Sequence, residues 1–145
     1  LILILSTGIN LRILSDYYID MKKTGGRISW SDAIYELANW LKENKPSNII
    51  ATHWVFCRNL YFLMQGEKYI YDLSEEKHIE DYAELFKDEN NIYLVNVQLS
   101  NSSFAEETSE KIFRKAVDIT GKKLIEEKIF YQRNGEQVYI AYSVK

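Results

Sequence analysis

The sequence has 145 residues, of which 46% are hydrophobic and 27% are charged, as is ordinary for a globular protein with one core. A formal net charge of −3, without clustered Lys and Arg, argues against a nucleic-acid binder, because phosphate contacts need such clusters. Cys57 is the only cysteine, which excludes an internal disulfide and a structural zinc cage of cysteines. No cofactor and no metal site is expected.

The start of the chain is strongly apolar. It begins at Leu1 without an initiator methionine, and residues 1–5 alternate leucine and isoleucine. This run is far shorter than the roughly 20 apolar residues that span a bilayer. It is either the end of a core strand or helix, or the stump of a membrane-spanning helix, and the run itself fits both. From Gly8 to Lys23 the apolar spacing is typical of one face of a helix, so a leading helix is expected.

The next helix is predicted between Ser31 and Pro46. The Ser31 hydroxyl can accept a hydrogen bond at the helix N-terminus, and Trp30 has the spacing to pack on Tyr35. Pro46 ends the pattern because it cannot continue a helix.

Three strand–helix units follow this helix. The strands are expected at 48–52, 69–72 and 92–97, with helices around 56–64, 79–86 and 112–117. Strands that alternate with helices favour crossover connections and parallel pairing. The order therefore predicts an α/β fold: a three-layer, Rossmann-like sandwich with a mainly parallel sheet.

The C-terminal segment predicts an antiparallel hairpin at the margin of this sheet. Asn134-Gly135 is typical of a two-residue type I′ turn, which would pair Arg133 with Glu136. The same register would place three apolar pairs on one face: Tyr131 with Val138, Ile129 with Ile140, and Ile125 with Val144.

A binding site, if the chain has one, is expected beyond the carboxyl ends of the strands, where open α/β sheets bind their ligands. The candidate ligand-binding residues there are Thr52, His53, Trp54, Arg58, Asp72 and Asn101. No glycine-rich phosphate-binding motif follows the first strand, which argues against a dinucleotide or P-loop site.

Structural interpretations of these residues compete with catalytic ones. His53 could act as a base near Asp72, but no second histidine or paired carboxylate has a diagnostic spacing, so a half-buried structural histidine is favoured. Cys57 could be an activated nucleophile at a helix N-terminus, but its apolar neighbours favour an inert thiol. No catalytic residue is predicted.

Two segments and the hairpin together carry a resemblance to a known family. Residues 26–41 read GRISWSDAIYELANWL, IATHW at 50–54 is followed by NLYFL at 59–63, and the chain closes with RNGE at 133–136. These patterns resemble the extracytoplasmic C-terminal domains of polytopic membrane glycosyltransferases, in the dolichyl-phosphate-mannose–protein mannosyltransferase-like group of bacteria and archaea. The resemblance is one of pattern and covers most of residues 26–145.

The resemblance implies that residues 1–25 are a membrane-proximal stump and leading helix, and that residues 26–145 form a single extracytoplasmic α/β domain tethered to the cell membrane. In such enzymes the catalytic acidic residues lie in loops between membrane helices, so this chain would be a non-catalytic accessory domain. The implied partners are the membrane-embedded portion of the parent chain and a glycan or protein acceptor.

Two other functions stay open from the residues alone. One is a stand-alone α/β enzyme or small-ligand binder that uses His53, Arg58 and Asp72. The other is a protein-interaction module, which predicts an exposed apolar patch of several hundred Å².

Overall fold

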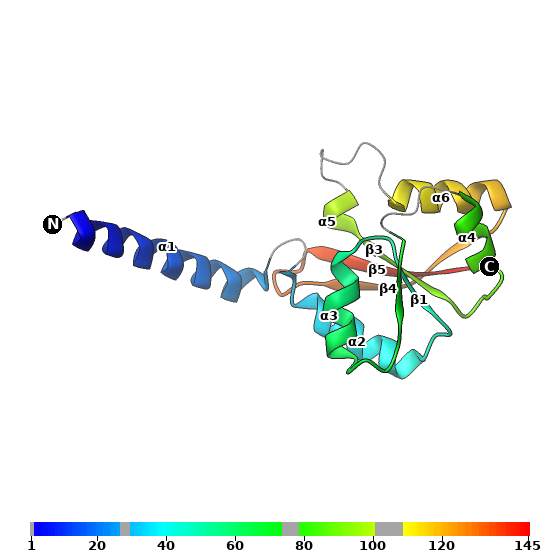
Figure 1. Ribbon diagram of the computed structural model, residues 1–145, viewed down its shortest axis with the longest axis horizontal. Coiled ribbons are helices and arrows are strands. Elements are labelled where there is room, and N and C mark those ends of the chain that lie inside the picture. The colour runs from blue at the N-terminus through cyan, green and yellow to red at the C-terminus, as the bar shows by residue number, and fades with distance from the viewer. Residues whose placement is uncertain (1, 27–29, 74–78, 101–108) are drawn as a thin grey trace.

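The computed structural model describes residues 2–26, 30–73, 79–100 and 109–145, and it shows an α/β body from which a leading helix projects (Figure 1). Within these residues the elements are, in chain order, α1 (Ile2–Thr24), α2 (Ala33–Asn44), β1 (Ile49–Ala51), α3 (Val55–Leu63), β2 (Ile70–Asp72), α4 (Ile79–Leu85), β3 (Ile92–Asn96), α5 (Val97–Ser100), α6 (Ser109–Thr120), β4 (Leu124–Tyr131) and β5 (Gln137–Val144). The predicted sequence of a helix, three strand–helix units and a hairpin is therefore confirmed.

The five strands form one mixed sheet in the order β2-β1-β3-β5-β4. β1 pairs in parallel with β2 and β3, whereas β5 pairs antiparallel with β3 and β4. The hairpin thus supplies the predicted antiparallel margin. The sheet as a whole has as many antiparallel as parallel pairings, because β5 takes the place beside β3.

Helices cover both faces of the sheet, and each face has its own core. Ile49 and Ala51 of β1 pack with α2 and α3 on one face. Ile50 points to the opposite face, where Tyr93 stacks on Phe113 of α6 with their ring centroids 5.0 Å apart. The alternation follows from the two-residue period of a strand, and it produces three layers.

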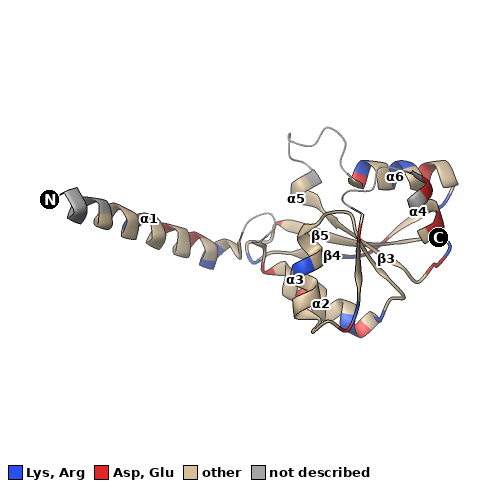
Figure 2. Ribbon diagram, in the orientation of Figure 1, with Lys and Arg blue, Asp and Glu red and all other residues tan. Residues whose placement is uncertain are grey.

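The leading helix α1 stands away from the body (Figure 1). The expected leading helix is present, and all its side chains from Thr7 to Ile19 are exposed, so its apolar face is uncovered. Its charged residues begin at Arg12, and residues 2–11 carry none (Figure 2). Among the described residues, no helix is both long enough and apolar enough to cross a membrane.

A tight turn and one arginine fix the base of α1 to the body. Gly25 and Gly26 have φ of 85° and 115°, which favour glycine, and the Asp32 N–H donates to the Gly25 carbonyl at 2.7 Å. Arg133, at the tip of the hairpin, donates from Nη1 to the Lys22 carbonyl at 2.7 Å. Its Nη2 lies 3.1 Å from the Asp32 carboxylate, so one side chain links α1, α2 and the hairpin.

The hairpin turn differs from the prediction. The Gly135 N–H donates to the Gln132 carbonyl at 2.8 Å, and the Gln132 N–H donates to the Glu136 carbonyl at 2.9 Å, so the loop has three residues rather than two. Gly135 has φ of 85°, whereas Asn134 is not in the left-handed region that a type I′ turn requires at both positions.

The altered loop changes the strand register. Ile129 pairs with Ile140 as predicted. The other three predicted pairs are wrong, because two irregularities shift the register along β4. The observed pairs are Tyr131 with Gln137 and Ile125 with Ser143, and Arg133 faces Asp32 instead of Glu136.

Candidate functional site

The carboxyl ends of β1 and β2 bring part of the predicted site together. β1 and β2 pair in parallel, with Ala51 opposite Asp72, so the residues that follow β1 lie at the same edge of the sheet as Asp72. Asn101 lies outside the described residues. At the end of β3, the Asn96 Oδ1 accepts hydrogen bonds from the backbone N–H groups of Gln98 and Leu99, each at 3.1 Å, and so caps the short helix α5, which the sequence did not predict.

Thr52 has a structural role. Its backbone N–H and its Oγ1 both donate to the carbonyl of Leu94, at 3.1 and 2.9 Å, and the side chain is fully buried. These bonds extend the pairing of β1 with β3, so Thr52 holds the strand end and does not face a ligand.

His53 is a half-buried imidazole near two carboxylates. Burial lowers the pKa of His53, while Glu110 and Asp72 act in the opposite direction. Its Nε2 is buried without a hydrogen-bond partner among the described residues. The Glu110 charge is compensated by Arg114, whose Nε lies 2.8 Å from Oε1. Burial therefore outweighs the two carboxylates and favours the neutral imidazole by lowering its pKa.

Cys57 lies beside Asp72 at the same strand ends. Burial, the charge of Asp72 and a hydrogen bond to its carboxylate raise the pKa of Cys57 to about 12. A thiol with this pKa is protonated at neutral pH and is a poor nucleophile. Of the two interpretations of Cys57, the geometry therefore favours the inert thiol.

Trp54 and Arg58 are exposed at the start of α3. They are one helical turn apart, and Trp54 is 62% exposed. Of the predicted site residues, His53 and Asp72 lie close enough together for the Asp72 charge to act on the imidazole. Within the described residues there is no group of three or more His, Cys, Asp and Glu side chains that could hold a metal ion.

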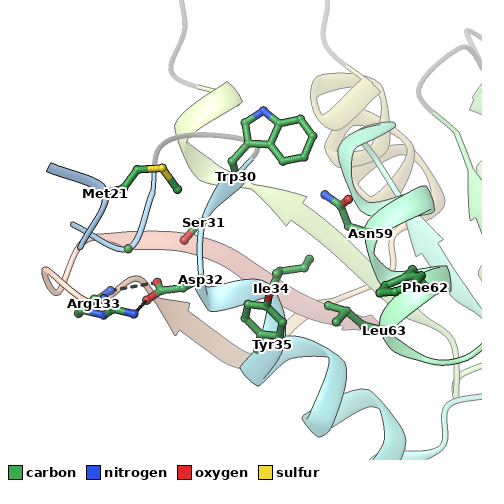
Figure 3. Close-up of a pocket in the computed structure, with 11 residues that line it drawn as sticks. Met21, Trp30, Ser31, Asp32, Ile34, Tyr35, Asn59, Phe62, Leu63 and Arg133 are labelled. Carbon is green, nitrogen blue, oxygen red and sulfur yellow. Dashed lines mark hydrogen bonds and ion pairs between the residues drawn. The ribbon is translucent and has the colours of Figure 1, made fainter. Parts of the chain in front are cut away.

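A second candidate site lies at the base of α1. It is a pocket of about 450 Å³ between the turn after α1, the start of α2, α3 and the hairpin tip (Figure 3). Its lining residues are Met21, Gly25, Trp30, Ser31, Asp32, Ile34, Tyr35, Asn59, Phe62, Leu63 and Arg133.

The pocket has apolar walls and few polar groups. Ile34 and Leu63 are partly buried against the core of α2 and α3. Trp30, Tyr35 and Phe62 surround them (Figure 3) and are 71%, 62% and 81% exposed. Trp30 was predicted to pack on Tyr35 at the start of the helix. Instead, both side chains are exposed and line the pocket.

Four polar side chains, those of Ser31, Asp32, Asn59 and Arg133, lie around the apolar walls. The Asp32–Arg133 ion pair is on one side, and Asn59 lies across the pocket (Figure 3). Asn59 Nδ2 donates to the Val55 carbonyl at 3.4 Å, and its Oδ1 has no hydrogen-bond partner among the described residues. Ser31 Oγ is engaged by the Ala33 N–H at 3.3 Å, so the Ser31 hydroxyl, rather than the Asp32 carboxylate, caps α2.

The sequence did not predict this pocket, because its walls come from four segments that are distant in the chain. The only available signal was the pair of aromatic residues that flank the N-terminus of α2. Comparisons of the chain with protein-family models, curated proteins and solved structures find no match. The functional proposals below therefore rest on the residues and their geometry.

Proposed function

We propose that this chain is a non-catalytic accessory domain, attached through α1 to the membrane-embedded portion of a glycosyltransferase-like protein on the extracytoplasmic side of the membrane. The observation that carries the proposal is the exposure of α1. Between Ile9 and Ile19 its seven large apolar residues are 49–68% exposed: Ile9, Leu11, Ile13, Leu14, Tyr17, Tyr18 and Ile19.

Uncovered apolar side chains favour attachment through this helix. Full burial of one Leu or Ile side chain contributes about 1.5–3 kcal/mol, so covering several of them is strongly favourable. Leu11, Leu14, Tyr18 and Met21 follow a three- and four-residue spacing, which places them on one face of the helix. Arg12, Asp16 and Asp20 lie toward the opposite face. A helix of this kind suits lateral packing on apolar membrane helices.

The arrangement of the first strands supports a Rossmann-like relationship as the finer description of the body. β2 and β3 flank β1 on its two sides, and the helices that follow β1 and β2 pack on opposite faces of the sheet. In doubly wound folds the ligand site lies where the strand order reverses, which here is between the ends of β1 and β3. His53 follows β1 there, although Thr52 and Asn96 are engaged in holding the backbone.

The same helix favours a second candidate function, a protein-interaction module in which a soluble partner covers α1. The two candidates differ in what binds the apolar face. A membrane-attached domain stays with the membrane fraction, whereas an interaction module elutes with a soluble partner in a larger complex.

A sedimentation experiment tests the proposal. The full 145-residue chain is mixed with washed membranes from the source cells and centrifuged through sucrose. The chain is expected in the pellet, and Leu11→Gln with Leu14→Gln is expected to move it to the supernatant. Ile119→Gln is the matched control, because Ile119 is an equally exposed apolar residue on α6, at 62%.

Equal sedimentation of the α1 variant and the wild type would contradict attachment through this helix. A wild type that stays in the supernatant but elutes in a larger complex from the soluble extract would favour the interaction module.

A further inference from the structure

The pocket at the base of α1 presents three exposed aromatic rings, those of Trp30, Tyr35 and Phe62, on backbone of defined geometry. Gly26 approaches Trp30 so closely that a Cβ at this position would lie 1.8 Å from the Trp30 carbonyl oxygen. Tyr35 extends from the first turn of α2 and Phe62 from the last turn of α3. The backbone positions of the three aromatic residues are therefore set before a ligand binds, which lowers part of the ordering cost of binding.

The polar groups of the pocket have unused hydrogen-bonding capacity. An ionised carboxylate offers about four acceptor sites and a guanidinium five donors, and the Asp32–Arg133 pair uses only part of them. On the opposite side, the Oδ1 of Asn59 can accept a hydrogen bond. The pocket therefore offers both donors and acceptors on two sides of an apolar floor.

These properties discriminate between classes of ligand. The paired charges of Asp32 and Arg133 cancel, which favours a neutral ligand over an ionic one. A purely apolar chain would take water away from Asn59 and from the ion pair without replacing its hydrogen bonds, and this is costly. A sugar ring has apolar C–H faces that stack on aromatic rings, and its hydroxyl groups at the edge both donate and accept.

The size of the pocket also agrees with a small neutral ligand. Its volume of about 450 Å³ lies within the roughly 300–1,000 Å³ of small-molecule sites. We infer that this pocket binds a neutral sugar unit of a glycan, with the ring against Trp30 and Phe62 and its hydroxyl groups toward Asn59 and the Asp32–Arg133 pair. The inference rests on the proposed function only for its biological role, in which the bound sugar belongs to the acceptor.

Binding can be measured on the full chain by NMR. The ¹⁵N-labelled protein is titrated with the methyl glycosides of glucose, mannose and galactose, and with N-acetylglucosamine. The three indole N–H signals report separate places: Trp30 in the pocket, Trp40 against Phe130, and Trp54 on α3 outside the pocket. A saturable shift of the Trp30 signal with at least one sugar is expected, with the Trp40 and Trp54 signals unchanged.

Matched variants locate the binding. Trp30→Ala and Asn59→Leu are each expected to weaken the affinity about tenfold, the order of one lost stacking or hydrogen-bonding contact. Because Trp30→Ala lacks the Trp30 indole signal, the affinities of all variants are taken from the backbone amide shifts of Ile34 and Leu63, which also line the pocket. Trp54→Ala removes an equally prominent ring, 62% exposed, and should keep the wild-type affinity. Dispersed amide spectra of all three variants establish that each is folded.

Three results would overturn the inference: no Trp30 shift with any of the sugars, equal shifts of the Trp30 and Trp54 signals, or a Trp30 shift with N-acetylphenylalanine amide but with no sugar. The last would assign the pocket to an apolar peptide side chain. The absence of sugar binding would not contradict the proposed membrane attachment. That proposal is tested by sedimentation of the Leu11 and Leu14 variants, and neither residue lines the pocket.

Discussion

Burial at the strand ends favours the uncharged form of two neighbouring side chains. It lowers the pKa of His53 and raises that of Cys57. In the unfolded chain both groups return to their ordinary pKa values. Each pKa difference therefore makes the stability of the domain depend on pH, with the losses of stability at opposite ends of the pH scale.

For His53 the loss of stability comes in acid. The unfolded chain binds a proton near pH 6.5, whereas folded His53 binds one only at lower pH, so the free energy of unfolding falls as the pH drops below about 6.5. The slope from one such group is at most about 1.4 kcal/mol per pH unit. Urea unfolding between pH 7.5 and 5 should show a weaker pH dependence in His53→Gln than in the wild type. The same slope in both proteins would mean that His53 titrates normally in the folded state.

For Cys57 the expected consequence is low reactivity. With a pKa of about 12, the folded thiol has almost no thiolate at pH 8.5, whereas an unfolded cysteine is partly ionised there. Alkylation by iodoacetamide should therefore be at least tenfold slower in the native protein than in urea, as followed by mass spectrometry. Equal rates at pH 8.5 would contradict the buried, Asp72-bonded thiol.

At the scale of elements, Gly25 and Gly26 at the end of α1 are in backbone conformations that favour glycine. Gly26→Ala should destabilise the domain by about 2 kcal/mol or more, because it adds a clash with the Trp30 carbonyl to the cost of a left-handed conformation. Gly121→Ala is the control: Gly121 also has positive φ, but its added Cβ would meet no atom within 4 Å. Chemical unfolding gives the loss in free energy of unfolding for each variant. Equal losses would show that the close approach of Gly26 to the Trp30 carbonyl is not maintained.

Arg133 is expected to restrict the orientation of α1, because it contacts both the Lys22 carbonyl and the Asp32 carboxylate. This side chain is 55% exposed, so its ion pair with Asp32 contributes at most about 1 kcal/mol to stability. Arg133 also donates a hydrogen bond to the Lys22 carbonyl, so it links the last turn of α1 to the body. Spin labels at Ser15→Cys and Lys115→Cys in a Cys57→Ser background would report the α1–body distance. Arg133→Ala should broaden the distance distribution, whereas Arg12→Ala should not. A distribution of unchanged width in Arg133→Ala would show that the turn alone sets the orientation of α1.

Apart from the short helix α5, the helices and strands of the body were predictable because their patterns are local. The spacing of Leu37, Ala38 and Leu41 in α2 and the apolar run of β3 need no information from elsewhere in the chain. The type of hairpin turn was not predictable, because Asn134-Gly135 suits a two-residue turn and a three-residue loop alike. The three-residue loop is the one observed beside the contacts of Arg133 with Asp32 and Lys22, which lie more than 100 residues away in the sequence.

The candidate sites also differ in how far the sequence predicted them. The proximity of His53 and Asp72 follows from the rule that parallel strands end at one edge, so the sequence predicted it. The structural role of Thr52 and the pocket at the base of α1 depend on tertiary contacts: Thr52 bonds to Leu94, and the pocket needs α1, α2, α3 and the hairpin together. Local patterns carry no information about such contacts.

At the scale of the whole molecule, the body has well-packed cores on both faces of its sheet, whereas α1 has exposed apolar side chains. A helix with this surface is stable next to a partner that covers it. Attachment through α1 would also place the pocket at its base next to the attachment point, where an acceptor could be held close to a membrane-embedded active site.

The most direct test of this account is fractionation of the source cells with an antibody against the α/β body. The account predicts that the antigen stays with the membranes through a high-salt wash, is released only by detergent, and is digested by protease added to intact cells. Antigen that is recovered in the soluble fraction after lysis, and that is protected from external protease, would contradict both the attachment and the extracytoplasmic location.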